Sequence, residues 1–182
     1  MIYCFGDTIR IRTDPVWAVC IHIRSLCKSR HGRNEIQMKI LVTGGTGFIG
    51  SHTSVLLLQS GHDVVIADNL VNSKPTVIDS IEKITNRRPK FYECDLTDEA
   101  MCEQIFSEND FDSVIHFAGL KAVGESVSIP LEYYKNNLLS TLNVLMSMRR
   151  HGCKSFIFSS SATVYGNPHA LPITEDFPLS YT

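Results

Sequence analysis

Hydrophobic positions from Lys39 onward alternate between short apolar runs and longer segments with helical spacing. The short runs predict buried strands over Lys39–Thr43, Asp63–Asp68, Lys90–Asp95, Ser113–Ala118 and Phe156–Ser159. The longer segments predict helices over Phe48–Ser60, Thr76–Asn86, Asp98–Glu108, which Thr97 would cap, and Pro130–Arg150, followed by a loop over Ala162–Thr182. Strands that alternate with helices favour an α/β fold with a doubly wound parallel sheet, a Rossmann fold, whose ligands bind outside the carboxyl ends of the strands.

Residues 1–37 do not continue this pattern. They contain six Lys and Arg against three Asp and Glu, whereas residues 38–182 contain eleven against sixteen. We therefore expect two parts: residues 1–37, an extension that is disordered or an artefact of the chosen start, and residues 38–182, the Rossmann domain.

Composition excludes several classes of protein. The net charge of -2 offers no basic patch for nucleic acid, and no apolar run approaches the roughly 20 residues that span a membrane. Six cysteines lack any C-x-x-C pair, so we expect neither a metal site nor a disulfide framework. Cys94 and Cys153 are expected as buried packing residues with reduced thiols, which indicates a cytoplasmic protein.

Glycines gather between the first strand and the first helix, in the segment Thr43 to Gly50 (TGGTGFIG). A glycine-rich turn in this context lets the backbone approach a pyrophosphate at the start of a helix. Two spacings fit, one that starts at Gly44 and one that starts at Gly45. Asp68 ends the second strand about 20 residues later, where a carboxylate can bind ribose hydroxyls and repel the extra phosphate of NADP. The pattern therefore predicts NAD binding.

Other candidates follow later strands, and each has an ordinary alternative. Asp95 could bind the adenine amino group or simply flank a helix. Lys121 could reach the cofactor or be a surface cation. The hydroxyls of Ser159 to Ser161 could meet a substrate or form a turn. His116 lies within an apolar strand and is expected as a hydrogen-bonded core residue.

Four segments, TGGTGFIGSH, DNL, HFAGLKAVGES and FSSSATVYG, together resemble the UDP-glucose 4-epimerase family of extended short-chain dehydrogenases/reductases. The resemblance covers residues 38–182. It implies interconversion of UDP-glucose and UDP-galactose through a transient 4-keto sugar, with NAD as the cofactor. It also implies that the full-length enzyme is a homodimer, formed through the helices Asp98–Glu108 and Pro130–Arg150.

The resemblance further implies a role for individual residues. Ser161 would hold the reacting 4-hydroxyl as a catalytic residue, and Lys121 and Ser161 would contact the substrate. The residues expected around NAD are Gly44, Gly47, Phe48, Ile49, Gly50, Asp68, Asn69, Leu70, Asn72, Ser73, Asp95, Leu96, Phe117, Ala118, Gly119, Lys121, Asn136 and Ser159.

One element of the family pattern is missing, the catalytic Tyr-x-x-x-Lys. Tyr165 is followed four residues later by His169, and Tyr181 by only one further residue. The resemblance places the catalytic tyrosine shortly beyond Thr182 and implies that the fold is truncated after about the fifth strand, without a substrate domain. We therefore expect the chain by itself to be inactive.

Three alternatives stay open. A sugar-nucleotide 4,6-dehydratase needs an acid and a base after the serine of the fifth strand, where this sequence has Ala162 and Thr163. A decarboxylase acting on UDP-glucuronate is harder to dismiss. The third alternative is a non-catalytic NAD-binding fragment.

Overall fold

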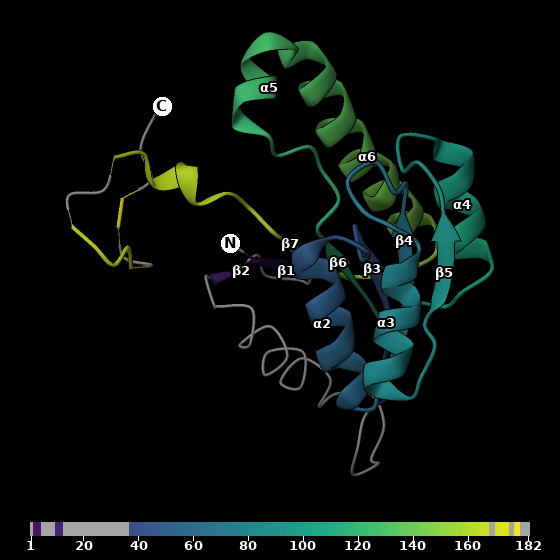
Figure 1. The fold of residues 1–182 in the computed structure, drawn as a ribbon. Coiled ribbons are helices and arrows are strands. Elements are labelled where there is room, and N and C mark those ends of the chain that lie inside the picture. Colours follow the sequence, from purple (N-terminus) through teal and green to yellow (C-terminus); the bar gives the residue numbers. More distant parts are fainter. Residues whose placement is uncertain (1, 5–9, 13–36, 168–169, 175–176, 179–182) are drawn as a thin grey trace.

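A computed structural model describes residues 2–4, 10–12, 37–167, 170–174 and 177–178. Its main sheet is parallel, and its strands run side by side in the order β5-β4-β3-β6-β7 (Figure 1). These strands are β3 (Lys39–Thr43), β4 (Asp63–Asp68), β5 (Lys90–Glu93), β6 (Ser113–His116) and β7 (Ser155–Phe158). Two short strands, β1 (Ile2–Cys4) and β2 (Arg10–Arg12), pair antiparallel. Most of the extension 1–37 lies outside the described residues.

Helices cover both faces of the main sheet, as a doubly wound fold requires. One face packs against α2 (Phe48–Gln59) and α3 (Thr76–Thr85), and the other against α4 (Glu99–Ser107) and α6 (Pro130–Arg150). Figure 1 shows the short helix α5 (Val123–Ser128) beside the N-terminal end of α6. A 3-10 turn follows at Ala162–Tyr165.

The central apolar runs β3, β4 and β6 are strands because each presents side chains to two buried faces in alternation. Ile40 and Val42 of β3 pack in the α2–α3 layer, whereas Leu41 packs in the α4–α6 layer. The same alternation places Ile115 in the first layer and Val114 in the second. This two-sided burial accounts for the nearly continuous hydrophobicity of these strands.

The strand order creates one reversal of direction. From β3 the chain winds outward through β4 to β5, and then returns to the other side of β3 to form β6 and β7. The connections at the carboxyl ends of β3 and β6 therefore diverge, which opens a crevice at this edge of the sheet. The glycine turn follows β3 directly and lies at this crevice.

The predicted elements are confirmed, with small shifts at their ends and two further differences. Thr97 is not the cap of α4: Asp98 is, since its carboxylate accepts a hydrogen bond from the Ala100 N–H at 2.8 Å. Aspartate is a stronger N-cap than threonine, and the Thr97 hydroxyl already donates a hydrogen bond to Asp95. Helix α5 is absent from the prediction because its sequence, VGESVS, contains glycine and two β-branched residues.

Candidate functional site

The glycine turn after β3 approaches β6 and the start of α2 too closely for side chains. Gly44 has φ +65°, and a Cβ on it would lie 2.7 Å from the Ala118 nitrogen. A Cβ on Gly45 would lie 2.6 Å from Ile66 Cγ2, and one on Gly50 would overlap the Gly44 carbonyl oxygen. The packing therefore excludes a side chain at Gly44, Gly45 and Gly50, which are glycines of the two spacings proposed from the sequence. The turn leaves backbone at the start of α2 accessible to a phosphate.

Asp68, at the end of β4, ties this turn to the following loop. Its Oδ2 accepts from the Thr46 N–H at 3.1 Å, and its Oδ1 accepts from the Leu70 N–H at 2.9 Å and from Ser73 Oγ at 3.4 Å. Thr46 Oγ1 and Ser73 Oγ lie 2.7 Å apart. Leu70 takes a left-handed conformation, φ 60°, which its hydrogen bond to Asp68 supports. Asp68 thus links the glycine turn before α2 to the loop after β4.

A cleft opens at the carboxyl ends of β3, β4, β5 and β6 and contains most of the predicted residues. Its lining is Gly44, Gly47, Ala67, Asp68, Asn69, Val71, Asn72, Ser73, Cys94, Asp95, Leu96, Phe117, Ala118, Gly119, Leu120, Asn136 and Ser140. Segments that are distant in the sequence therefore converge on one site.

The remaining predicted residues lie around this cleft without lining it. Phe48 is 83% exposed and Ile49 42%, on the first turn of α2, whereas Gly50 is buried beneath them. Lys121 is exposed beyond the end of the lining loop. Ser159 donates its N–H to the His116 carbonyl at 3.1 Å, which continues β7, and Ser161 is exposed just after it.

The loop after β5 closes one end of the cleft. The Cys94 N–H donates to the Asp68 carbonyl at 3.0 Å, which keeps the loop beside β4. Asp95 Oδ1 accepts from Thr97 N at 2.9 Å and from Thr97 Oγ1 at 2.8 Å. Burial raises the pKa of Cys94 to about 11 and that of Cys153 to about 11, so both are neutral packing thiols, as predicted.

His116 is a buried, hydrogen-bonded core residue, as predicted. Thr141 Oγ1 donates to the Asn137 carbonyl at 2.7 Å and therefore accepts from His116 Nε2 at 3.2 Å. This assigns the ring proton to Nε2, so Nδ1 accepts from Thr43 Oγ1 at 2.8 Å, and Thr43 Oγ1 accepts from the Ala118 N–H at 3.4 Å. Burial lowers the pKa of His116 to about 4, which keeps the ring neutral.

Comparison with known proteins identifies the family. Residues 40–182 match the NAD dependent epimerase/dehydratase family. The chain belongs to this family. It is 55% identical over 145 residues to the UDP-glucose 4-epimerase of Bacillus subtilis, an alignment that covers 80% of this chain and 43% of the relative. The chain thus spans less than half the length of the curated relatives it matches.

Solved structures agree. The UDP-glucose 4-epimerase of Bifidobacterium longum in complex with NAD+ and UDP is 56% identical, with a TM-score of 0.76 over 79% of this chain and 43% of that one. The enzyme from Stenotrophomonas maltophila, with bound NAD and formylated UDP-arabinopyranose, is 44% identical, with a TM-score of 0.75 over the same shares. These matches confirm the Rossmann fold and NAD as the cofactor of the family.

The cleft suits the cofactor of this epimerase/dehydratase family. The glycine turn has no room for side chains, so its backbone can approach the phosphates closely. The Asp68 carboxylate lies at the end of β4, where it can bind a ribose. In the described part of the chain, no helix is both long and apolar enough to cross a membrane.

Sequence reasoning missed Asn137, a residue that shapes the cleft. Its Oδ1 accepts from the Leu120 N–H at 2.8 Å, and its Nδ2 donates to the Leu120 carbonyl at 3.0 Å. This amide therefore holds the lining loop after β6 against α6. The pair Asn136-Asn137 near the start of a helix was the available signal, because asparagine is a poor helix former.

Proposed function

We propose that residues 38–182 form the cofactor-binding part of a UDP-glucose 4-epimerase, which interconverts UDP-glucose and UDP-galactose. The observation that carries the proposal is the hydrogen bond from the Thr46 N–H to Asp68, which joins the glycine turn to the carboxylate at the head of the cleft. A pyrophosphate and an adjacent ribose need this juxtaposition.

The residues that would hold NAD divide by chemistry. Backbone from Gly44 to Gly50 would face the pyrophosphate, Asp68 the ribose hydroxyls, and Asp95 with Leu96 the adenine. The negative charge of Asp68 disfavours the additional phosphate of NADP. When bound, NAD supplies reversible hydride acceptance at the sugar C4. Ser161 Oγ would hold the sugar 4-hydroxyl through a hydrogen bond, and Lys121 would contact the cofactor and the substrate from the rim.

We further propose that the 182-residue chain alone does not catalyse epimerisation. A general base must remove the 4-hydroxyl proton, and within these 182 residues no tyrosine is followed by a lysine four positions later. The test is to incubate the chain with NAD and UDP-galactose and follow UDP-glucose formation. Turnover above the no-protein background would contradict the proposal, whereas NAD binding without turnover would support it.

Other enzymes of the family need different groups. Dehydration requires an acid and a base after Ser161, and the residues there are Ala162 and Thr163. This favours epimerisation over 4,6-dehydration. To separate an epimerase from a decarboxylase or a non-catalytic fragment, the coding sequence should be read beyond the codon for Thr182. A continuing Tyr-x-x-x-Lys supports the enzyme, and an immediate stop supports the fragment.

For the full-length enzyme we propose a cytoplasmic homodimer. Helix α6 presents an apolar stripe in which Leu131 is 77% exposed, Tyr134 66%, Leu138 58% and Leu142 53%. Such a stripe is typical of a surface covered by another subunit or segment. Light scattering of the full-length enzyme should give twice the monomer mass, and a monomer would refute the proposal.

A further inference from the structure

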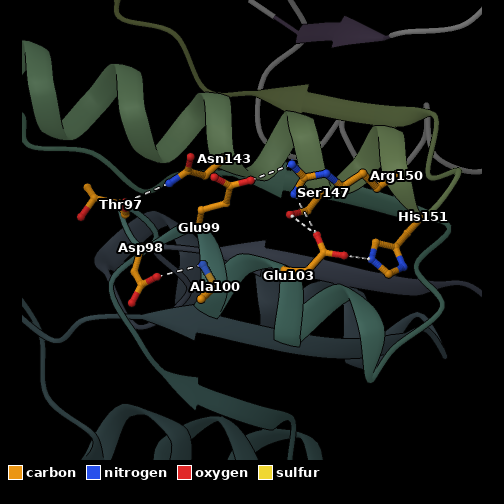
Figure 2. A network of polar contacts seen from close by, with 9 residues as sticks. All are labelled: Thr97, Asp98, Glu99, Ala100, Glu103, Asn143, Ser147, Arg150 and His151. Atoms are coloured by element: carbon orange, nitrogen blue, oxygen red, sulfur yellow. Dashed lines mark hydrogen bonds and ion pairs between the residues drawn. The ribbon is translucent and has the colours of Figure 1, made fainter.

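Asn143 lies in the middle of α6, far from the glycine turn in sequence, and only 2% of it is exposed. Its Nδ2 donates to the Leu96 carbonyl at 3.0 Å and to the Thr97 carbonyl at 2.9 Å. Figure 2 shows the Asn143 side chain reaching from α6 toward Thr97. One buried amide therefore holds two consecutive peptide groups of the loop after β5.

The opposite side of this loop faces the cleft. Asp95 and Leu96 line it, and Asp95 Oδ1 is already engaged by the Thr97 N–H and hydroxyl. The position of Thr97 therefore sets the orientation of the Asp95 carboxylate, and Asn143 sets the position of Thr97. The loop after β5 is therefore bonded both to α6, through Asn143, and to the Asp95 carboxylate, through Thr97.

The neighbouring contacts between α4 and α6 are of a different kind. Glu103 bonds Ser147 at 3.4 Å, Arg150 at 3.3 Å and His151 at 2.7 Å, and Arg150 also reaches Glu99 at 2.7 Å (Figure 2). The ion pairs in this group are solvent-exposed and contribute little to stability. A buried amide bonded to two carbonyls is costlier to remove, because the carbonyls lose their partner.

We infer that Asn143 is a positioning residue for adenine recognition, through its hydrogen bonds to the Leu96 and Thr97 carbonyls. It keeps the Asp95 carboxylate facing the cleft, where it accepts from the 6-amino group of adenine. The inference rests on the proposed NAD site and deepens it, by naming the residue that makes one end of the cleft selective for an aminopurine.

The test compares NAD with its deaminated analogue, nicotinamide hypoxanthine dinucleotide, which carries a carbonyl where adenine has the 6-amino group. Isothermal titration of the 182-residue chain should show that NAD binds about tenfold more tightly, the effect of one hydrogen bond to a charged acceptor. Asn143→Leu keeps the branched shape and the number of side-chain heavy atoms and removes the donor. In this variant NAD affinity should fall about tenfold while the analogue is nearly unchanged, so the ratio approaches one.

The matched control is Ser147→Ala, one turn further along the same face of α6. Ser147 is fully buried, and its hydroxyl bonds Glu103 of α4, whereas Asn143 bonds the loop after β5. It should keep the tenfold ratio. If Asn143→Leu does not fold, Asn143→Thr replaces it; this variant keeps one hydroxyl donor and should give an intermediate ratio of about threefold.

The outcomes separate the two proposals. If the unmodified chain binds neither dinucleotide, the proposed cofactor site is wrong. If it binds both dinucleotides equally, the cofactor site stands and the role of Asn143 is refuted. The same conclusion follows if the Asn143 variants weaken both ligands by the same factor and so retain the tenfold ratio. A ratio that collapses in Asn143→Leu and survives in Ser147→Ala supports the inference.

Discussion

The two sides of the cleft are built differently. On the β4–β5 side, the Asp68 carboxylate bonds three groups of the turn and loop around it, and all of them lie within 22 residues in the sequence. On the β6–β7 side, the loop after β6 is held by His116 and by Asn137, through contacts to β3 and α6 that cross up to 75 residues.

This difference separates local from long-range construction. The β4–β5 side is built mainly from local contacts, because one carboxylate and its neighbours form the turn and the loop after β4. The loop after β5 is in addition bonded to α6, through Asn143. The β6–β7 side depends on a buried network, and it ends at β7, an edge strand of the described sheet, with Ser161 exposed beyond it. We therefore expect the part of the β4–β5 side around Asp68 to be set by one charge and the β6–β7 side by the packing of the core.

The largest effect should come from Gly50, where one change breaks both sides. A valine at position 50 would drive Cβ into the Gly44 carbonyl, and Gly44 itself contacts the backbone of Ala118. Gly50→Val should lower the free energy of unfolding by about 3 kcal/mol and raise the NAD dissociation constant more than about 100-fold. Urea unfolding and isothermal titration measure the two effects.

The control for this change is Gly124→Ala in α5. Apart from its chain neighbours and the backbone of its own helix, nothing lies within 4 Å of the Cβ position there, so alanine should stabilise the helix by about 0.5–1 kcal/mol without altering NAD affinity. Equal losses in both variants would mean that close packing of the turn is not what Gly50 provides.

The second effect concerns only the β6–β7 side and depends on pH. The pKa of His116 is lowered by burial, and to a lesser degree by Lys121, from 6.5 to about 4. Between these values the unfolded chain binds a proton that the folded chain does not, so stability is full above pH 6.5 and falls as the pH drops toward 4. The loss attributable to His116 is about 3 kcal/mol.

His116→Gln isolates this contribution. Carboxylates with lowered pKa values, such as Glu103 and Glu108, also lose stability in acid, but they are present in both proteins. Urea unfolding at several pH values between 7 and 4 should therefore show a steeper decline for the unmodified chain than for the variant. Parallel curves would contradict a neutral, buried His116.

Sequence reasoning recovered the local side of the cleft more fully than the long-range side. The glycine turn and Asp68 can be predicted from the sequence because a strand, a turn and a helix in succession dictate their chemistry. The core role of His116 followed from its apolar strand, but its partners Thr43 and Thr141 did not. Nothing in spacing indicates which helix residue will meet a given strand.

The missed residues share that cause. Asn137 and Asn143 lie on a helix whose pattern predicts only length and an apolar face, and the backbone groups they bond come from loops 17 to 47 residues away. Helix α5 was not predicted because its own residues favour a helix only weakly. Its packing against α6 supports it instead. Tertiary contacts decide both cases.

A third prediction alters the β4–β5 side alone. Asp68→Asn removes the charge and turns one acceptor oxygen into a donor that faces the Thr46 or Leu70 N–H. NAD should bind about tenfold more weakly, and discrimination against NADP should shrink, because the repelling charge is gone. Titration with both dinucleotides measures this. Asp63→Asn, at the other end of the same strand, is the control and should change neither affinity.

The smallest effect should come from Arg150, which lies outside both sides of the cleft. Its guanidinium pairs with Glu99 and Glu103, and all three side chains are between 40% and 52% exposed. Exposed ion pairs contribute little, and His151 still contacts Glu103 after Arg150 is removed. Arg150→Met should therefore shift Tm by less than about 4 °C, with a smaller shift at high salt, and leave NAD affinity unchanged.

The comparison with Asn143→Leu gives this last variant its value. Both changes remove polar contacts that α6 makes. Asn143 bonds the loop after β5, whereas Arg150 bonds α4, the helix that follows this loop. If Arg150→Met weakened NAD binding as much as Asn143→Leu, then general docking of α4 on α6 would control the cleft. An unchanged affinity would restrict that control to the one buried amide, because the exposed pairs would then affect only how firmly α4 is attached.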